Sequence, residues 1–143
     1  MTPTFAPTIK WARAFLWAQG RDDLAERLPN DSCWPQIGQA VRDGLVPAEI
    51  VESATQALIA SGNGWACYLY CRYVQDLPEV RAALIASGNG WACYCYCLNV
   101  QDLPEVRAAL IASGDGRACY YYCLNVQDHR DVRAVAERAG YTV

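Results

Sequence analysis

Cysteine pairs spaced one helical turn apart are the residues of this sequence with the clearest capacity for chemistry. They occur within the segments CYLYC, CYCYC and CYYYC, which hold seven of the eight cysteines. Two thiolates at positions i and i+4 supply half of the ligand set that a tetrahedral zinc requires, and paired thiols are also the basis of redox sites. The candidate ligands are Cys67, Cys71, Cys93, Cys97, Cys119 and Cys123.

The spacing nevertheless favours packing over metal binding or disulfide formation. Equivalent cysteines belong to neighbouring helices, whose axes usually lie about 8–10 Å apart. The Cα atoms of an unstrained disulfide lie within about 7 Å of each other. The single histidine, His129, stands outside the cysteine pattern. We therefore expect reduced cysteines that serve as small hydrophobic residues and no bound cofactor, with a thiol-based metal-binding or redox site as the alternative.

Three nearly identical segments carry these cysteines. Ser61, Ser87 and Ser113 lie 26 residues apart, and the repeat units cover residues 55–80, 81–106 and 107–132. A fixed period of this length is typical of solenoids, in which each unit buries its apolar face against its neighbours. We expect an N-terminal helical cap over residues 1–54 and a repeat array over residues 55–143, closed by a C-terminal capping helix.

Each unit contains the signals for two short helices. Asp76 before Leu77-Pro78-Glu79 predicts an N-cap with proline in the first turn of a helix that runs to residue 87. Gly88 predicts a left-handed residue that ends this helix, and Asn89 predicts the N-cap of a second helix over residues 91–101. One unit is therefore predicted to be a compact helical hairpin.

The alternation of aromatic residues in CYLYC is also compatible with a strand, which would give a β/α solenoid. Differences between the copies favour a helix. The invariant residues of the first copy, Cys67, Tyr70, Cys71 and Val74, follow the i, i+3, i+4, i+7 pattern of a buried helix face, and the positions that vary gather on the opposite side. We predict an all-α fold, a short right-handed α-solenoid, with the β/α solenoid as the alternative.

Polar residues also recur with the repeat period. Arg81 lies close to the recurring Asp76, and such pairs predict ion pairs between units. The hydroxyl of Tyr70 and its equivalents, on the core side, predicts a hydrogen bond to backbone or to the recurring glutamine at position 75. Both sets are interpreted as structural.

The variable side of the second helix is the strongest candidate for function, because exposed Trp, Tyr, Leu and Arg are typical of interface hot spots. We predict that a protein partner binds there. The candidate partner-binding residues are Trp65, Leu69, Arg72, Tyr73, Trp91, Leu98, Asn99, Arg117, Tyr121 and Asn125. The alternative is that further structure, such as the N-terminal segment or a second copy in a homo-oligomer, covers this side.

Composition and charge bear on other classes of function. Hydrophobic residues make up 53% of the 143 residues, and the formal net charge of −3 provides no basic footprint for nucleic acid. No apolar run reaches the length of a membrane span, and Lys10 and Arg13 lie in the wrong order for a secretory signal. We find no nucleophile–base set and no phosphate-binding loop. The sequence thus predicts a cytoplasmic protein that is not an enzyme.

The array from Thr55 to Val132 places an ASGNG or ASGDG turn before an aromatic-rich helix that ends in VQD. In this it resembles bacterial and phage-type proteins built of short tandem α-helical repeats, and more distantly HEAT-type repeats. The resemblance implies a helical solenoid whose exposed surfaces bind other proteins. Taken with the variable side, it leads us to expect an adaptor, or an inhibitor that acts by occlusion.

Overall fold

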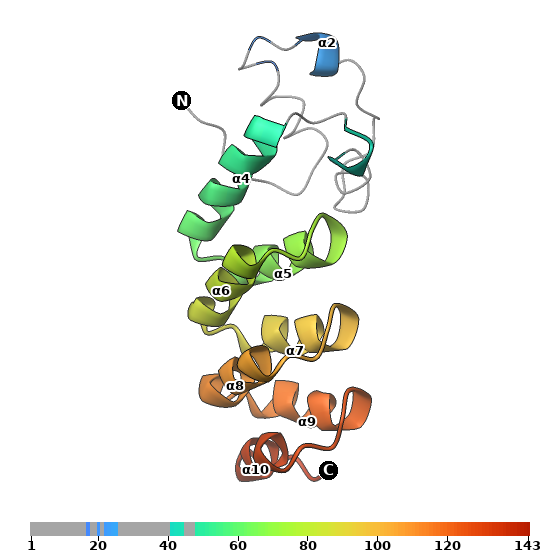
Figure 1. The fold of residues 1–143 in the computed structure, drawn as a ribbon. Helices are drawn as coiled ribbons and strands as arrows, with labels where there is room; N and C mark the ends of the chain where they lie inside the picture. Colours follow the sequence, from blue (N-terminus) through green and yellow to red (C-terminus); the bar gives the residue numbers. More distant parts are fainter. Residues whose placement is uncertain (1–16, 18–19, 21, 26–40, 45–47) are drawn as a thin grey trace. The chain divides into compact units, whose positions relative to one another are not determined.

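The computed structural model describes residues 17, 20, 22–25, 41–44 and 48–143. The chain divides into two compact units, one of residues 1–61 with 73–75 and one of residues 62–72 with 76–143. In the described residues every regular element is a helix (Figure 1). The all-α prediction is therefore confirmed, and the β/α alternative is wrong.

The first unit contains helices α2 (Asp22–Ala25) and α4 (Ala48–Ser61). Helix α4 confirms the helix predicted from the segment PAEIVESATQALIAS. Leu58 is buried, and the Thr55 hydroxyl donates to the Val51 carbonyl at 2.7 Å. Most of the predicted N-terminal cap, including the helix expected from TIKWARAFLWAQ, lies outside the described residues, so the cap stays a prediction.

The second unit is a stack of short helices joined by tight turns (Figure 1). The helices are α5 (Gly64–Tyr73, whose last residue groups with the first unit), α6 (Pro78–Ser87), α7 (Gly90–Asn99), α8 (Pro104–Ser113), α9 (Gly116–Asn125) and α10 (Arg130–Arg138). Helix α7 packs against α8 and α9, and α10 packs against α8 and α9. The helices thus form two layers, with α6, α8 and α10 in one and α5, α7 and α9 in the other.

Residues at equivalent positions of each repeat form the core. Val80, Val106 and Val132 are fully buried, as are Leu84 and Leu110 one turn later. The predicted buried side of α5 is confirmed, because its cysteines, Tyr70 and Val74 are all buried. The core therefore repeats with the sequence and runs through the stack.

The turn between the two helices of a repeat forms as the sequence predicts. Gly88 has φ +72°, in the left-handed region that glycine adopts at little cost, and it ends α6. The Asn89 side chain accepts a hydrogen bond from the Ala92 amide at 3.0 Å and so caps α7. Asp115 caps α9 in the same way through the Ala118 amide.

The second glycine of each turn has a different role, which the sequence did not reveal. Gly90, the first residue of α7, faces the next turn so closely that an added Cβ would lie 2.8 Å from the Asp115 Cβ and 3.0 Å from the Ser113 Cβ. A Cβ on Gly64 would lie 2.9 Å from the Ser87 Cβ. Glycine at this position therefore lets successive turns approach each other.

One prediction about helix starts was wrong. Helix α6 begins after Leu77, which has no side-chain capping bond, and α8 begins in the same way after Leu103. Asp76 and Asp102 do not cap these helices, because their carboxylates bind side chains of the following repeat. Proline in the first turn, where no amide donor is needed, supports these helix starts instead.

Candidate interaction surface

A cluster of four polar side chains joins the first repeat to the second. The Tyr96 hydroxyl donates to the Asp76 carboxylate at 2.9 Å, and the Arg81 Nε donates to the Tyr96 oxygen at 2.9 Å. The Gln101 amide donates to the same carboxylate at 2.7 Å. Arg81 and Asp76 also form an ion pair at 3.5 Å. We call these four residues the first junction cluster.

The same cluster recurs 26 residues later. The Tyr122 hydroxyl donates to Asp102 at 2.7 Å, and Gln127 donates to the Tyr122 oxygen at 3.1 Å. Arg107 contacts Tyr122 at 3.3 Å and pairs with Asp102 at 3.6 Å. These four residues form the second junction cluster. The predicted ion pairs and tyrosine–glutamine contacts are confirmed at both junctions, and the structure shows that they are one network.

The junction tyrosines are neutral hydrogen-bond donors at physiological pH. Burial raises the pKa of Tyr96 to about 12, with smaller opposing contributions from its hydrogen-bond partners. Burial likewise raises the pKa of Tyr122. A phenol titrating so far above neutrality is poorly matched to acid–base catalysis, so these contacts hold repeats together.

The cysteines of the described residues are all buried. Burial raises the pKa of Cys67 and Cys93 to about 11 and that of Cys97 and Cys119 to about 12. The thiolate is the form that binds metals and attacks electrophiles, so these thiols are held in their less reactive state. No three histidine, cysteine, aspartate or glutamate side chains in the described residues gather at one point to hold a metal ion.

We call the twelve positions at which the second helices of the repeats differ the variable stripe. Three of its apolar side chains are clearly exposed, with Trp65 at 42%, Leu98 at 42% and Leu124 at 52% of their surface accessible. The stripe consists of Trp65, Leu69, Arg72 and Tyr73 on α5, Trp91, Cys95, Leu98 and Asn99 on α7, and Arg117, Tyr121, Leu124 and Asn125 on α9.

The rest of the stripe is less uniformly exposed. Arg72 and Arg117 are exposed, whereas Leu69, Trp91 and Tyr121 are half-buried, as is Tyr73, and Cys95 is buried. The stripe is thus a surface of exposed aliphatic and charged side chains set among partly covered rings.

Two stripe residues bridge neighbouring helices. The Asn99 amide donates to the Tyr68 hydroxyl at 2.8 Å, and the Asn125 amide donates to the Tyr94 hydroxyl at 2.9 Å. Both asparagines are exposed, so they stay accessible while they join one repeat to the next. The sequence prediction assigned them to partner binding alone and missed this contact, which spans 31 residues.

Rings and one cation gather where α7 meets α9. Trp91 lies 5.1 Å from Tyr94 and 5.8 Å, edge-on, from Tyr121. The Arg117 guanidinium lies 5.1 Å from the Trp91 ring and 5.9 Å from the Tyr121 ring. The substitutions that distinguish the third repeat, Arg117 and Tyr121, thus both contact the tryptophan of the second repeat.

Tyr73 is the one predicted partner-binding residue that belongs to the first unit. Its carbonyl accepts a hydrogen bond from the Arg42 guanidinium at 3.0 Å. The structure therefore does not bring Tyr73 together with the rest of the stripe.

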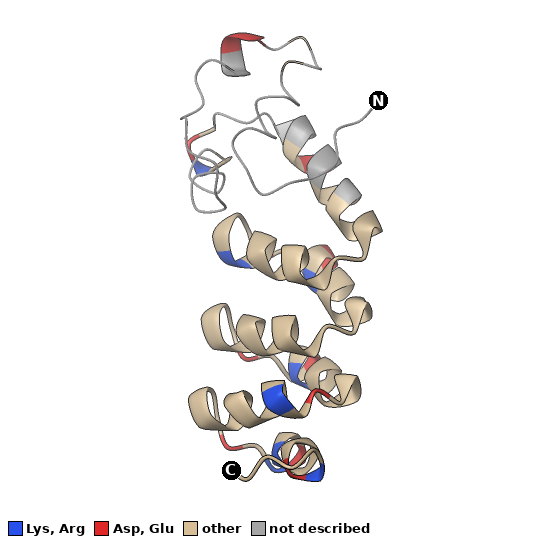
Figure 2. Ribbon diagram, turned by 180° about the vertical axis from the view of Figure 1, so that it is seen from behind, with Lys and Arg blue, Asp and Glu red and all other residues tan. Residues whose placement is uncertain are grey.

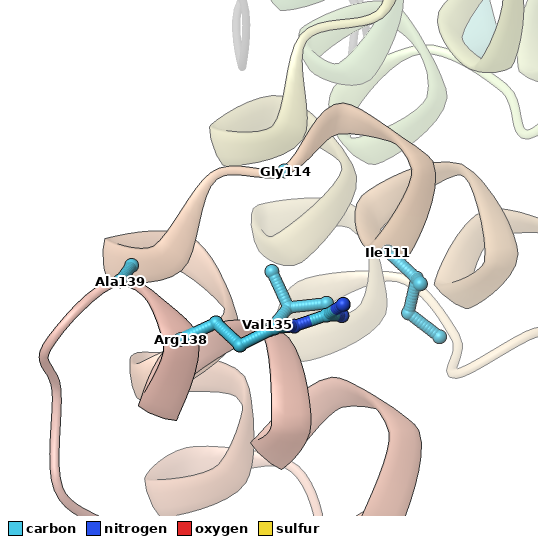
Figure 3. Close-up of a pocket in the computed structure, with 5 residues that line it drawn as sticks. All are labelled: Ile111, Gly114, Val135, Arg138 and Ala139. Atoms are coloured by element: carbon cyan, nitrogen blue, oxygen red, sulfur yellow. The ribbon is translucent and has the colours of Figure 1, made fainter.

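A groove of about 340 Å³ lies away from the stripe, between the end of α8 and α10. It is lined by Ile111, Gly114, Val135, Arg138 and Ala139 (Figure 3). The Arg138 Nε donates to the Ala134 carbonyl of its own helix at 3.2 Å. None of the residues predicted to bind a partner or a metal lines this groove.

Comparison of the chain with protein-family models, curated proteins and solved structures gave no match. Within the described residues, no helix combines the length and apolar character needed to span a membrane. The functional argument therefore rests on the geometry of the repeats.

Proposed function

We propose that this chain is a non-enzymatic interaction module that binds a protein partner through the variable stripe. Its action is that of an adaptor, or of an inhibitor that occludes the site it covers. The HEAT-like and phage-type resemblance of the repeats supports this class of function, since helical solenoids present extended binding surfaces.

The exposure of Leu98 and Leu124 carries the proposal. They occupy the same position of successive repeats on the packed helices α7 and α9, and are 42% and 52% exposed. The invariant cysteines of the same helices are buried. A large aliphatic side chain exposed twice at one register contributes nothing to the core, but it supplies apolar area that a partner can bury.

The test is a double variant, Leu98→Ser with Leu124→Ser, in the full chain. The matched control is Ala82→Ser with Ala108→Ser, which changes exposed residues of α6 and α8 in the other helix layer. Proteins captured from cells that encode the chain are quantified by mass spectrometry, and the main candidate is purified and its affinity measured.

We expect the stripe variant to weaken binding at least about tenfold, because two exposed anchors are lost, and the control to bind as the wild type does. Both variants should unfold within about 0.5 kcal/mol of the wild type, as is usual for surface changes. Equal binding by the stripe variant and the control would contradict the proposal.

A further inference from the structure

Charge is distributed unevenly between the two layers of the second unit. The stripe contains two arginines and no carboxylate. Acidic residues instead begin the other helices, with Glu79 in the first turn of α6, Glu105 in α8 and Asp131 in α10. Figure 2 shows basic but no acidic residues along α5 and α9, and neither on α7. A chain with a net charge of −3 thus has one surface whose own charges are all positive.

Neutral aromatic groups hold the two stripe arginines in place. Arg117 lies against the rings of Trp91 and Tyr121, at 5.1 and 5.9 Å. Arg72 donates to the Tyr68 hydroxyl at 3.0 Å. A ring orients a guanidinium through its quadrupole without neutralising the charge, so these contacts leave a cation that is already positioned for an anionic group.

The apolar anchors beside these cations have a spacing that suits a helix. Leu98 and Leu124 lie on packed neighbouring helices, whose axes are usually about 8–10 Å apart. Residues seven apart on a helix lie on one side of it and are separated by about 10.5 Å, from a rise of about 1.5 Å per residue. A helix crossing α7 and α9 can therefore place one apolar side chain against each leucine.

We infer that the partner segment bound by the stripe is an acidic amphipathic helix. Its apolar residues, spaced seven apart, contact Leu98 and Leu124, and its carboxylates face Arg117 and Arg72. This inference rests on the proposed function and specifies the chemistry of the partner. Charge complementarity selects the acidic segment, because the stripe offers only positive charge to whatever covers its leucines.

The test is selection of helical peptides from a display library against the immobilised full chain. Surface positions of the peptides are randomised among Leu, Ala, Gln, Glu and Lys, so that neither charge is favoured at the start. Parallel selections use Arg117→Glu, Arg117→Gln and the Leu98→Ser, Leu124→Ser double variant. Affinities of the enriched peptides, and of versions with Glu changed to Gln or Lys, are measured by titration.

We expect the wild type to enrich peptides rich in Glu with Leu at i and i+7, and a Glu-to-Lys exchange to weaken them at least tenfold. Arg117→Glu should invert the preference toward Lys, and Arg117→Gln should reduce it. Peptides with no acidic bias, an unchanged bias against Arg117→Glu, or no enrichment at all would overturn the inference. In the first two cases the proposed function would stand if the leucine variant still lost binding.

Equal enrichment on the leucine double variant would overturn both the inference and the proposed function, because binding would then lie outside the stripe. A second arm uses an oligothymidylate and vesicles containing phosphatidylglycerol as probes. Binding to either that is as tight as that of the best acidic peptide would overturn the inference, since it would assign the positive charge to a different anion.

Discussion

The junction clusters and the variable stripe are built on the same three repeats but follow opposite rules. The two junction clusters consist of the same four residue types in the same contacts, at Tyr96 and again at Tyr122. The stripe changes at every copy, from Trp91 to Arg117 and from Cys95 to Tyr121. Sameness thus belongs to the joints between repeats, and difference belongs to the surface that the joints leave exposed.

The turn glycine offers the strongest way to break the constant side of this comparison. Gly90→Ala should lower the free energy of unfolding by about 3 kcal/mol, because the new methyl group overlaps the next turn. Its position would be 2.8 Å from the Asp115 Cβ and 3.0 Å from the Ser113 Cβ. Chemical denaturation followed by circular dichroism measures the loss.

A double-mutant cycle with Ser113→Gly identifies the cause of that loss. Removing the Ser113 side chain relieves part of the overlap, so Gly90→Ala should cost at least about 1 kcal/mol less in that background. An equal cost in both backgrounds would show that the close approach of the turns is not responsible.

The junction tyrosine should have the next largest effect. Tyr96→Phe should cost about 2 kcal/mol, because it leaves buried polar partners without their hydroxyl. Tyr121→Phe on the stripe is the matched control and should change stability by less than about 0.5 kcal/mol. Both are measured by denaturant unfolding at neutral pH, and equal costs would erase the distinction between junction and stripe.

A pH series sharpens the same comparison with a smaller effect. The pKa of Tyr96 is raised to about 12 in the fold, whereas an unfolded tyrosine titrates near about 10. Its contribution is therefore complete below pH about 10 and is lost as the pH rises toward about 12. The stability gap between wild type and Tyr96→Phe should shrink by about 1 kcal/mol between pH 9 and 11.

Unfolding under reducing conditions measures this gap, since the buried cysteines titrate alike in both proteins and cancel in the difference. The Tyr121→Phe control should show no such narrowing. A gap that stays constant from pH 9 to 11 would mean that the Tyr96 hydroxyl is not held neutral by its junction.

Features that depend on near neighbours in the chain could be predicted from the sequence. Gly88 and Asn89 fix the turn through their own backbone and side-chain preferences, and the helical spacing of Cys67, Tyr70 and Cys71 identifies the buried side. The exposed Glu137 and Arg138 of the last helix were predicted for the same reason.

Features that depend on distant partners could not be predicted in full. Asp76 has the local context of an N-cap, but its carboxylate binds a tyrosine 20 residues away. Asn99 resembles an open surface residue until Tyr68, 31 residues earlier, is placed beside it. The need for glycine at position 90 arises from the next turn, and Tyr73 belongs to a different unit from its neighbours on α5.

The junction cluster also bears on how the length of this array can change. Each junction uses residues of one repeat corner and of the following repeat, at offsets that recur after 26 residues. If residues 81–106 were removed, Asp76 would meet Arg107, Tyr122 and Gln127 at the offsets it now has to their counterparts. Whole repeats can therefore be gained or lost in a single genetic step without creating a new joint, and each such step lengthens or shortens the binding surface by one helix.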